Sequence, residues 1–174
     1  IGMDQVLGAR VSDGFFRTLG VNPLIGRDFY AGEDLPAAPY TMILSYASWQ
    51  KRFGAKQDVV GQPITLNDIS YTIVGVLPQN FHFAPMENAE FWVTLHPRDR
   101  GCDSRRSCHF LNGLGRLKDG VSSSAALEDL KQIARDLEQQ YPDSNRAQGA
   151  TVVPLTQFIV GDVKKVDIIV RTHV

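Results

Sequence analysis

One stretch decides the fold class, and it reads Thr41-Met42-Ile43-Leu44-Ser45-Tyr46-Ala47-Ser48-Trp49-Gln50-Lys51-Arg52-Phe53-Gly54. The apolar run over residues 41–44 predicts a short buried strand. Ser45 and Gly54 are typical of the start and the end of a helix, so the segment between them is predicted to be helical. Trp49 and Phe53 lie four residues apart on one face of that helix, where we expect them to pack into a core.

Two further apolar runs follow, at residues 63–66 and 71–77. The polar residues 67–70 separate them, and this pattern predicts a β-hairpin with a polar turn. Pro78 has no backbone N–H to donate, so the second strand is expected to end before it. Another strand is predicted at residues 91–95.

The N-terminal part of the chain predicts a strand at residues 6–11 followed by a short helix at residues 13–19. Ser12 is suited to cap the start of this helix, and Gly20 is suited to end it. Its two adjacent phenylalanines are expected to pack on the inner side.

The clearest periodic signal lies in the second half, between Ser122 and Tyr141, where leucines and alanine recur at helical spacing. Strands are predicted on both sides of this amphipathic helix, at residues 111–118 and 149–155. Strand, helix and strand form a split βαβ unit. The whole order of elements predicts an α+β fold, with short helices on one face of an antiparallel or mixed sheet.

The composition is that of a globular protein. The chain has 174 residues, of which 43% are hydrophobic and 21% charged, with a formal net charge of -1. This content argues against disorder, and the charge balance gives no reason to expect nucleic-acid binding. Four arginines between residues 98 and 106 are interrupted by Asp99 and Asp103, which is typical of a solvated loop. No apolar run is long enough to cross a bilayer.

The sequence carries no catalytic, metal or cofactor motif that we recognise. The four histidines are scattered and form no metal-binding spacing. Ser45 follows a predicted strand but lacks the flanking glycines of a nucleophile elbow. Gly113 and Gly115 are only a fragment of a dinucleotide fingerprint. We therefore predict no enzyme activity and no cofactor.

Two cysteines, Cys102 and Cys108, lie in a polar segment that is expected to be an exposed loop. A loop of this length can close into a disulfide, and exposed thiol pairs are oxidised outside the cytoplasm. The alternatives are a metal site that includes His109, or two free thiols. Zinc sites usually have tighter spacing and four ligands, so a disulfide is the favoured interpretation.

Exposed aromatic residues in loops are the usual anchors of interfaces. Phe81, Phe83 and Met86 lie in a proline-flanked loop and are the candidate interface residues. The alternative is that they form a small hydrophobic cluster that closes this part of the fold.

One series of segments, taken together, indicates a protein family more specifically than any single segment does. It comprises Gly8-Ala9-Arg10-Val11-Ser12-Asp13-Gly14-Phe15-Phe16, Pro23-Leu24-Ile25-Gly26-Arg27-Asp28-Phe29 and Tyr71-Thr72-Ile73-Val74-Gly75-Val76-Leu77-Pro78, with residues 43–46, 49–54, 60–67, 115–121, 141–145 and 153–155. The series resembles the MacB-like periplasmic core domain of ABC transporter permeases, and it is most similar to the duplicated orphan permease branch. The resemblance extends to about Val163.

The resemblance implies a domain architecture. In this family the domain lies outside the inner membrane, between the first and second transmembrane helices. A porter-like α/β part is interrupted by a β-rich insertion. On this chain, residues 1–20 and 105–163 would form the porter-like part, residues 21–104 the insertion with a short helix, and residues 164–174 a tail. The family's domain begins further upstream, so the porter-like part is expected to lack its N-terminal portion.

The resemblance also implies a function. ATP hydrolysis in the cytoplasm would drive the membrane helices, and the domain would pass this motion to extracytoplasmic partners or to cargo for export. The implied partners are a second permease copy or half, a periplasmic adaptor protein and a cytoplasmic ATPase, with the parent protein embedded in the membrane. Two alternatives remain: a periplasmic ligand- or lipid-binding module with an apolar cleft, and a hydrolase whose site is assembled by the fold.

Overall fold

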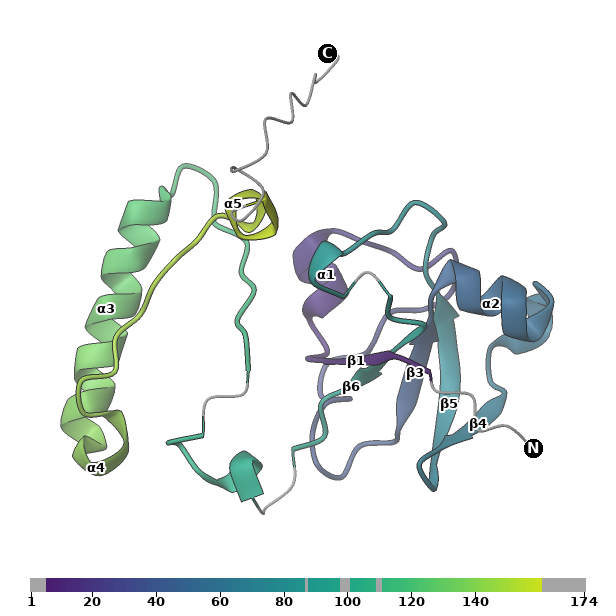
Figure 1. Ribbon diagram of the computed structural model, residues 1–174, viewed down its shortest axis with the longest axis horizontal. Helices are drawn as coiled ribbons and strands as arrows, with labels where there is room; N and C mark the ends of the chain where they lie inside the picture. The colour runs from purple at the N-terminus through teal and green to yellow at the C-terminus, as the bar shows by residue number, and fades with distance from the viewer. Residues whose placement is uncertain (1–5, 87, 98–100, 109–110, 161–174) are drawn as a thin grey trace, which may run out of the picture. The chain divides into compact units, whose positions relative to one another are not determined.

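The computed structural model describes residues 6–86, 88–97, 101–108 and 111–160 (Figure 1). The chain divides into two compact units. Unit 1 comprises residues 1–105 and 110–116, and unit 2 comprises residues 106–109 and 117–174. Unit 1 holds a mixed β-sheet with short helices, and unit 2 is helical in its described part. The predicted α+β class is confirmed.

Unit 1 is built from one sheet of six strands, which is purple to teal in Figure 1. The order is β1-β6-β3-β5-β2, and β4 also pairs with β5. The pairs β1–β6 and β3–β5 are parallel, and the others are antiparallel. The strands are β1 (Gly8–Val11), β2 (Ile25–Gly26), β3 (Thr41–Leu44), β4 (Pro63–Leu66), β5 (Ile69–Val76) and β6 (Phe91–Thr94).

Each face of this sheet has its own hydrophobic cluster. Ile43 and Trp92 belong to the cluster that includes Phe16 of helix α1 (Phe15–Leu19). Met42 and Val93, their sequence neighbours, belong to the cluster that includes Trp49 of helix α2 (Tyr46–Phe53). Successive side chains of a strand point to opposite faces, so β3 and β6 are covered on both sides. This is why β3 is a continuous apolar run rather than an alternating one. The prediction that the short helices lie on one face of the sheet is wrong, because α1 and α2 pack on opposite faces.

The strand–helix prediction that decided the fold class is confirmed residue by residue. β3 and α2 have the expected bounds, and the Ser45 hydroxyl accepts a hydrogen bond from the Ser48 N–H at 3.1 Å. Gly54 ends α2 in the left-handed conformation. The hairpin also forms, but its turn is two residues long rather than four, because β5 already begins at Ile69. Asn67 and Asp68 both have positive φ, which is the signature of a tight turn that matches strand twist.

Helix α1 differs from its prediction. It begins at Phe15 with Gly14 in the capping position, and no side chain caps it. Ser12 contributes its backbone carbonyl, which accepts from the Phe15 N–H at 3.2 Å. The Asp13 carboxylate binds a distant loop instead of starting the helix. The predicted stop is confirmed, since Gly20 has φ of 73° and ends α1.

Unit 2 contains α3 (Ser123–Gln140), α4 (Pro142–Asn145) and α5 (Leu155–Val160). Ser122 caps α3, because its hydroxyl accepts a hydrogen bond from the Ala125 N–H at 3.1 Å. The strands predicted at residues 111–118 and 149–155 are wrong, since neither segment belongs to a ladder. A strand exists only through pairing, and every ladder among the described residues lies within the unit 1 sheet.

Three short 3-10 helices complete the described elements: η1 (Gln57–Val59), η2 (Ala84–Met86) and η3 (Gly101–Ser104). β1 and α1 share their sheet and core with residues 21–97. The assignment of residues 1–20 to a porter-like part with residues 105–163 stays a prediction. The proposed tail, residues 164–174, lies outside the described residues.

Candidate functional site

An aromatic cluster covers the α1 side of the unit 1 sheet. Its members are Phe15, Phe16, Phe29, Phe81, Phe83 and Trp92. The Phe15 ring stacks on Trp92 at 5.3 Å and meets Phe83 edge-on at 5.2 Å. Phe16, which is fully buried, meets Phe81 at 5.7 Å. Such stacked and edge-on pairs stabilise beyond the burial of apolar area, so residues 81–83 are held against α1 and β6.

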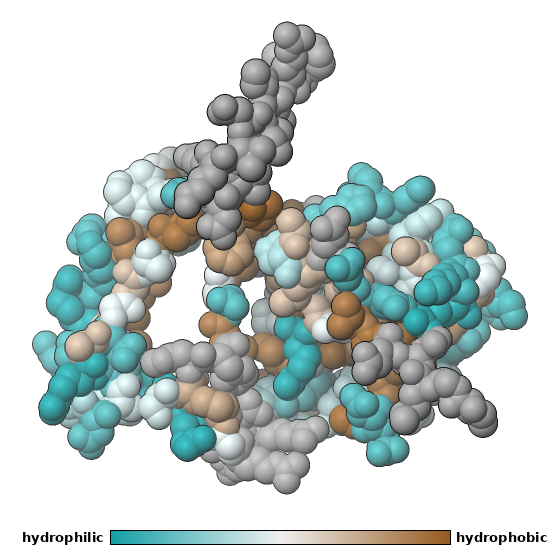
Figure 2. All heavy atoms as spheres, in the orientation of Figure 1, coloured by the Kyte–Doolittle hydropathy of each residue, from teal (hydrophilic) through white to brown (hydrophobic). Residues whose placement is uncertain are grey.

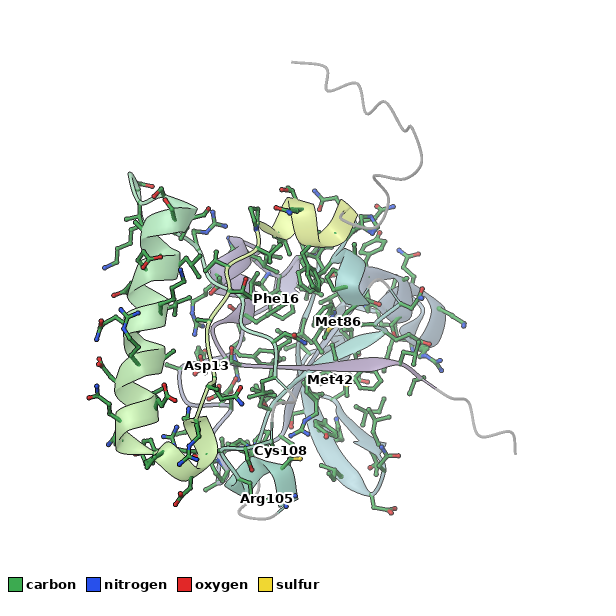
Figure 3. All side chains as sticks on the ribbon, turned by 60° about the vertical axis from the view of Figure 1, so that its left-hand side comes forward. Asp13, Phe16, Met42, Met86, Arg105 and Cys108 are labelled. Atoms are coloured by element: carbon green, nitrogen blue, oxygen red, sulfur yellow. The ribbon has the colours of Figure 1, made fainter. Side chains whose placement is uncertain are left out.

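The structure places the three predicted interface residues differently from one another. Phe81 and Phe83 are half-buried in the aromatic cluster. Met86 of η2 is 40% exposed and is the member of the trio that most clearly reaches solvent. Phe16 and Met86 can be followed in Figure 3. The interface role of the trio stays a prediction, and its solvent-accessible contribution comes chiefly from Met86.

A polar network that the sequence patterns did not predict organises residues 27–41. Arg27 and Glu33 form a bidentate ion pair with N···O distances of 2.6 and 2.9 Å. The same carboxylate accepts from the Tyr30 N–H at 3.0 Å and from the Thr41 hydroxyl at 3.5 Å. Burial raises the pKa of Glu33, but these hydrogen bonds outweigh it, so the pKa of Glu33 is lowered overall. Glu33 therefore acts as the charged centre of this loop.

A second set of contacts joins this loop to α1. The Asp13 carboxylate accepts from the Gly32 N–H at 2.5 Å, and the Asp34 carboxylate accepts from the Asp13 N–H at 3.2 Å. Arg17 of α1 donates to the Phe29 carbonyl at 2.6 Å and lies 3.6 Å from the Asp28 carboxylate. Asp13 is labelled in Figure 3. The spacing of Asp13 and Arg17 at i,i+4 was the only sequence signal for this connection.

The described residues contain no cluster of three or more His, Cys, Asp or Glu side chains that could hold a metal ion. Of the histidines, His82 is exposed and His96 is buried, while His109 and His173 lie outside the described residues. The metal alternative that includes His109 therefore cannot be placed. Neither Cys102 nor Cys108 is a free thiol in the structure, which agrees with the predicted disulfide between them, and the disulfide stays a prediction for chemical test.

A surface hollow of about 360 Å³ lies at the C-terminal end of α2. Its lining includes Arg52, Phe53, Lys56 and Asp58. Arg52 is bound to Glu90 by hydrogen bonds of 2.6 and 3.1 Å. A mixed, charged lining of this kind differs from the apolar cavities with a few convergent polar groups that bind small molecules.

Unit 2 exposes much of its apolar surface. None of the side chains of α3 is buried, and Ile133 on this helix is 46% exposed. Phe158 of α5 is 61% exposed. Figure 2 shows hydrophobic residues gathered along one side of α3. No described helix is both long and apolar enough to span a membrane. Exposed apolar residues grouped in this way are typical of surfaces that another structure covers.

Comparison with known proteins gives a family and a fold. A family model described as the MacB-like periplasmic core domain matches residues 2–133. Among solved structures, the periplasmic region of MacB from Actinobacillus actinomycetemcomitans is similar, with a TM-score of 0.50 and 14% identity. The match covers 78% of this chain and 57% of that chain, so this chain spans a little over half of that region.

A second similar structure is a permease-protein domain from Porphyromonas gingivalis, with a TM-score of 0.45 and 18% identity. That match covers 85% of this chain and 69% of the other. No curated protein matches the sequence.

Proposed function

Because the chain belongs to the MacB-like periplasmic core domain family, we propose that it is the extracytoplasmic domain of an ABC transporter permease and transmits ATP-driven motion from membrane helices to extracytoplasmic partners or cargo for export. The observation that carries this proposal is the family match across residues 2–133. The proposed partners are a second permease copy or half, a periplasmic adaptor protein and a cytoplasmic ATPase. In this proposal the domain is not an enzyme and needs no cofactor.

The construction of unit 1 supports a mechanical role. A domain that passes on motion must move as one body, because a soft body would absorb the displacement. Unit 1 has a hydrophobic cluster on each face of its sheet and a loop tied to α1 by charged groups. Close-packed interiors of this kind resist deformation.

Exposed apolar groups supply candidate contact surfaces for the proposed partners. Met86 on unit 1 and the apolar side of α3 on unit 2 are solvent-accessible. Interface cores are rich in methionine and aromatic residues and poor in charge. We expect partner contacts to include these residues.

The proposal is tested by measuring distances in the parent permease in membranes. Spin labels at Lys51 on α2 and Asp129 on α3 would report on unit 1 against unit 2, since both residues are exposed. A control pair at Lys51 and Asp68 lies within unit 1. We expect ATP to shift the distance distribution of the first pair and to leave the control pair unchanged.

If ATP leaves both distributions unchanged while the ATPase hydrolyses it, the domain does not transmit motion between its units and the proposal is wrong. A change in the control pair as well would show that unit 1 deforms, which contradicts a rigid lever. A shift that follows an added lipid or small ligand but not ATP would favour a binding module.

A further inference from the structure

One titratable group is buried in unit 1 outside the polar networks described above. His96 is 5% exposed and comes two residues after the end of β6. Its φ of 45° lies in the left-handed region, which L-residues adopt only when the surroundings hold them there. Pro97 follows, and the chain then leads to the cysteine segment.

The His96 ring is packed against an aromatic side chain. It lies on the Tyr40 ring with a centroid distance of 4.3 Å, and Tyr40 in turn meets Tyr71 edge-on at 5.4 Å. Within the described part of the chain, neither His96 Nδ1 nor Nε2 has a hydrogen-bond partner of normal geometry. A neutral ring can occupy such a site as an aromatic group. A protonated ring would carry a charge and two N–H donors into this buried site, where neither nitrogen has a hydrogen bond of normal geometry and, among the described residues, the Leu35 backbone is the one polar group that favours it at short range.

Charged groups act on His96 from β1 and from the loop before β3. Arg10 of β1 donates to the Leu95 carbonyl and approaches the His96 carbonyl at 3.5 Å. The Glu33 and Asp34 carboxylates, in the loop before β3, favour a positive charge on the ring. Burial lowers the pKa of His96, and Arg10 adds to this. The Leu35 backbone and the two carboxylates act in the opposite sense without cancelling it.

We propose that His96 is a proton-sensitive latch. In its neutral form the ring is held against Tyr40 and fixes the end of β6. When the ring is protonated it leaves this position and loosens the end of β6. The latch is a local opening of unit 1, so it does not depend on the transport function proposed above.

The direction of the pH effect follows from linkage. In the open state the ring is solvated and has its ordinary pKa of about 6.5, whereas in the closed state the pKa is lower. Well above pH 6.5 the ring is neutral in both states, and protonation does not favour the open state. As the pH falls below that value, the open population is expected to grow about tenfold per pH unit, until the closed-state pKa is reached.

The test is amide hydrogen exchange by NMR on the whole 174-residue chain, between about pH 7.5 and 5, with rates expressed as protection factors at each pH. We expect protection at Val93 and Thr94 to fall about tenfold per pH unit below 6.5, while amides of α2 keep theirs. The His96 ring, followed in the same samples, is expected to titrate below 6.5.

Two variants and a control complete the test. His96→Phe and His96→Gln cannot be protonated, and in both the pH dependence at Val93 and Thr94 should disappear. The control, His82→Gln, changes an exposed histidine and should behave like the wild type. The latch is overturned if wild-type protection at these amides does not change with pH, if a variant keeps the wild-type change, or if the ring titrates at 6.5 or above. The first and third readings need only the wild type, so a variant that fails to fold does not prevent a decision.

Discussion

Units 1 and 2 have similar fractions of apolar residues, but unit 1 buries many of them and the described part of unit 2 leaves them exposed. In unit 1 both faces of the sheet are covered, and residues such as Phe16 and Ile43 are fully buried. In unit 2 the longest helix of the described chain, α3, has a regular apolar stripe and no buried side chain. The difference shows that a strong periodic pattern is sufficient to predict a helix, whereas burial of its apolar side also requires a structure that packs against it.

The largest expected difference between the units is in the cost of truncating an apolar side chain. Phe16→Ala removes a fully buried ring and should lower the free energy of unfolding of unit 1 by about 3–5 kcal/mol. Ile133→Ala removes an exposed side chain and should change it by about 0.5 kcal/mol or less. Urea unfolding of both variants measures this. Equal effects would show that α3 is packed in solution.

The next expected effect concerns a close backbone contact in unit 1. Gly26 has φ of 75°, and a Cβ there would lie 2.2 Å from the Val74 carbonyl oxygen. Gly61 also has a positive φ, of 90°, but a Cβ there meets nothing within 4 Å. Both alanine variants place a Cβ on a left-handed backbone, which costs about 1 kcal/mol. Only Gly26→Ala adds a steric clash, and we expect it to cost about 2 kcal/mol more in thermal or urea unfolding.

The ion pair of the loop before β3 gives a smaller effect with a defined pH dependence. The pKa of Glu33 is lowered in the folded chain, so its contribution is present above the unfolded pKa of about 4.5 and is lost as the pH falls through the lower folded value. Glu33→Gln should cost about 1–2 kcal/mol at pH 7 and flatten the acid loss of stability. Urea midpoints at several pH values measure this. The matched control is Glu128→Gln on α3. Lys131 lowers the pKa of this carboxylate too, but Glu128 is fully exposed, so the variant should leave the urea midpoint unchanged.

The smallest expected effect concerns the cysteine segment. A disulfide between Cys102 and Cys108 would leave no thiol for maleimide labelling of the folded protein before reduction, and two after it. Non-reducing peptide mapping should find the two cysteines in one linked peptide. Labelling of either cysteine without reductant would contradict the predicted pairing.

Local sequence signals predicted unit 1 well because the residues that begin and end its helices and strands lie within or beside those elements. The bounds of β3 and α2 agree with those predicted from Ser45, Gly54 and the apolar run before Ser45. Asn67 and Asp68 accept left-handed backbone, so the hairpin turn is tighter than the polar run suggested. Ser12 failed as a cap because Asp13 beside it is bound to the Gly32 backbone, a contact that no local pattern contains.

Features that depend on distant residues were not predicted. Two contacts join segments far apart in the sequence. One is the hydrogen bond from the Gly32 N–H to the Asp13 carboxylate, and the other is the packing of the His96 ring on Tyr40. The strand predictions at residues 111–118 and 149–155 failed for the same reason, because an apolar alternation does not show whether a partner strand is present. Phe81 and Phe83 were identified as aromatic and loop-borne, but their half-buried state follows from α1 and β6.

The central claim, that this is an extracytoplasmic domain of a permease, is tested most directly by topology in the parent protein. Cys102 and Cys108 are changed to Ser, and Ser123→Cys places a single thiol at the exposed start of α3. Intact cells are then treated with a membrane-impermeant maleimide. We expect labelling without permeabilisation. Labelling only after lysis, with the protein folded, would place the domain in the cytoplasm and contradict the account.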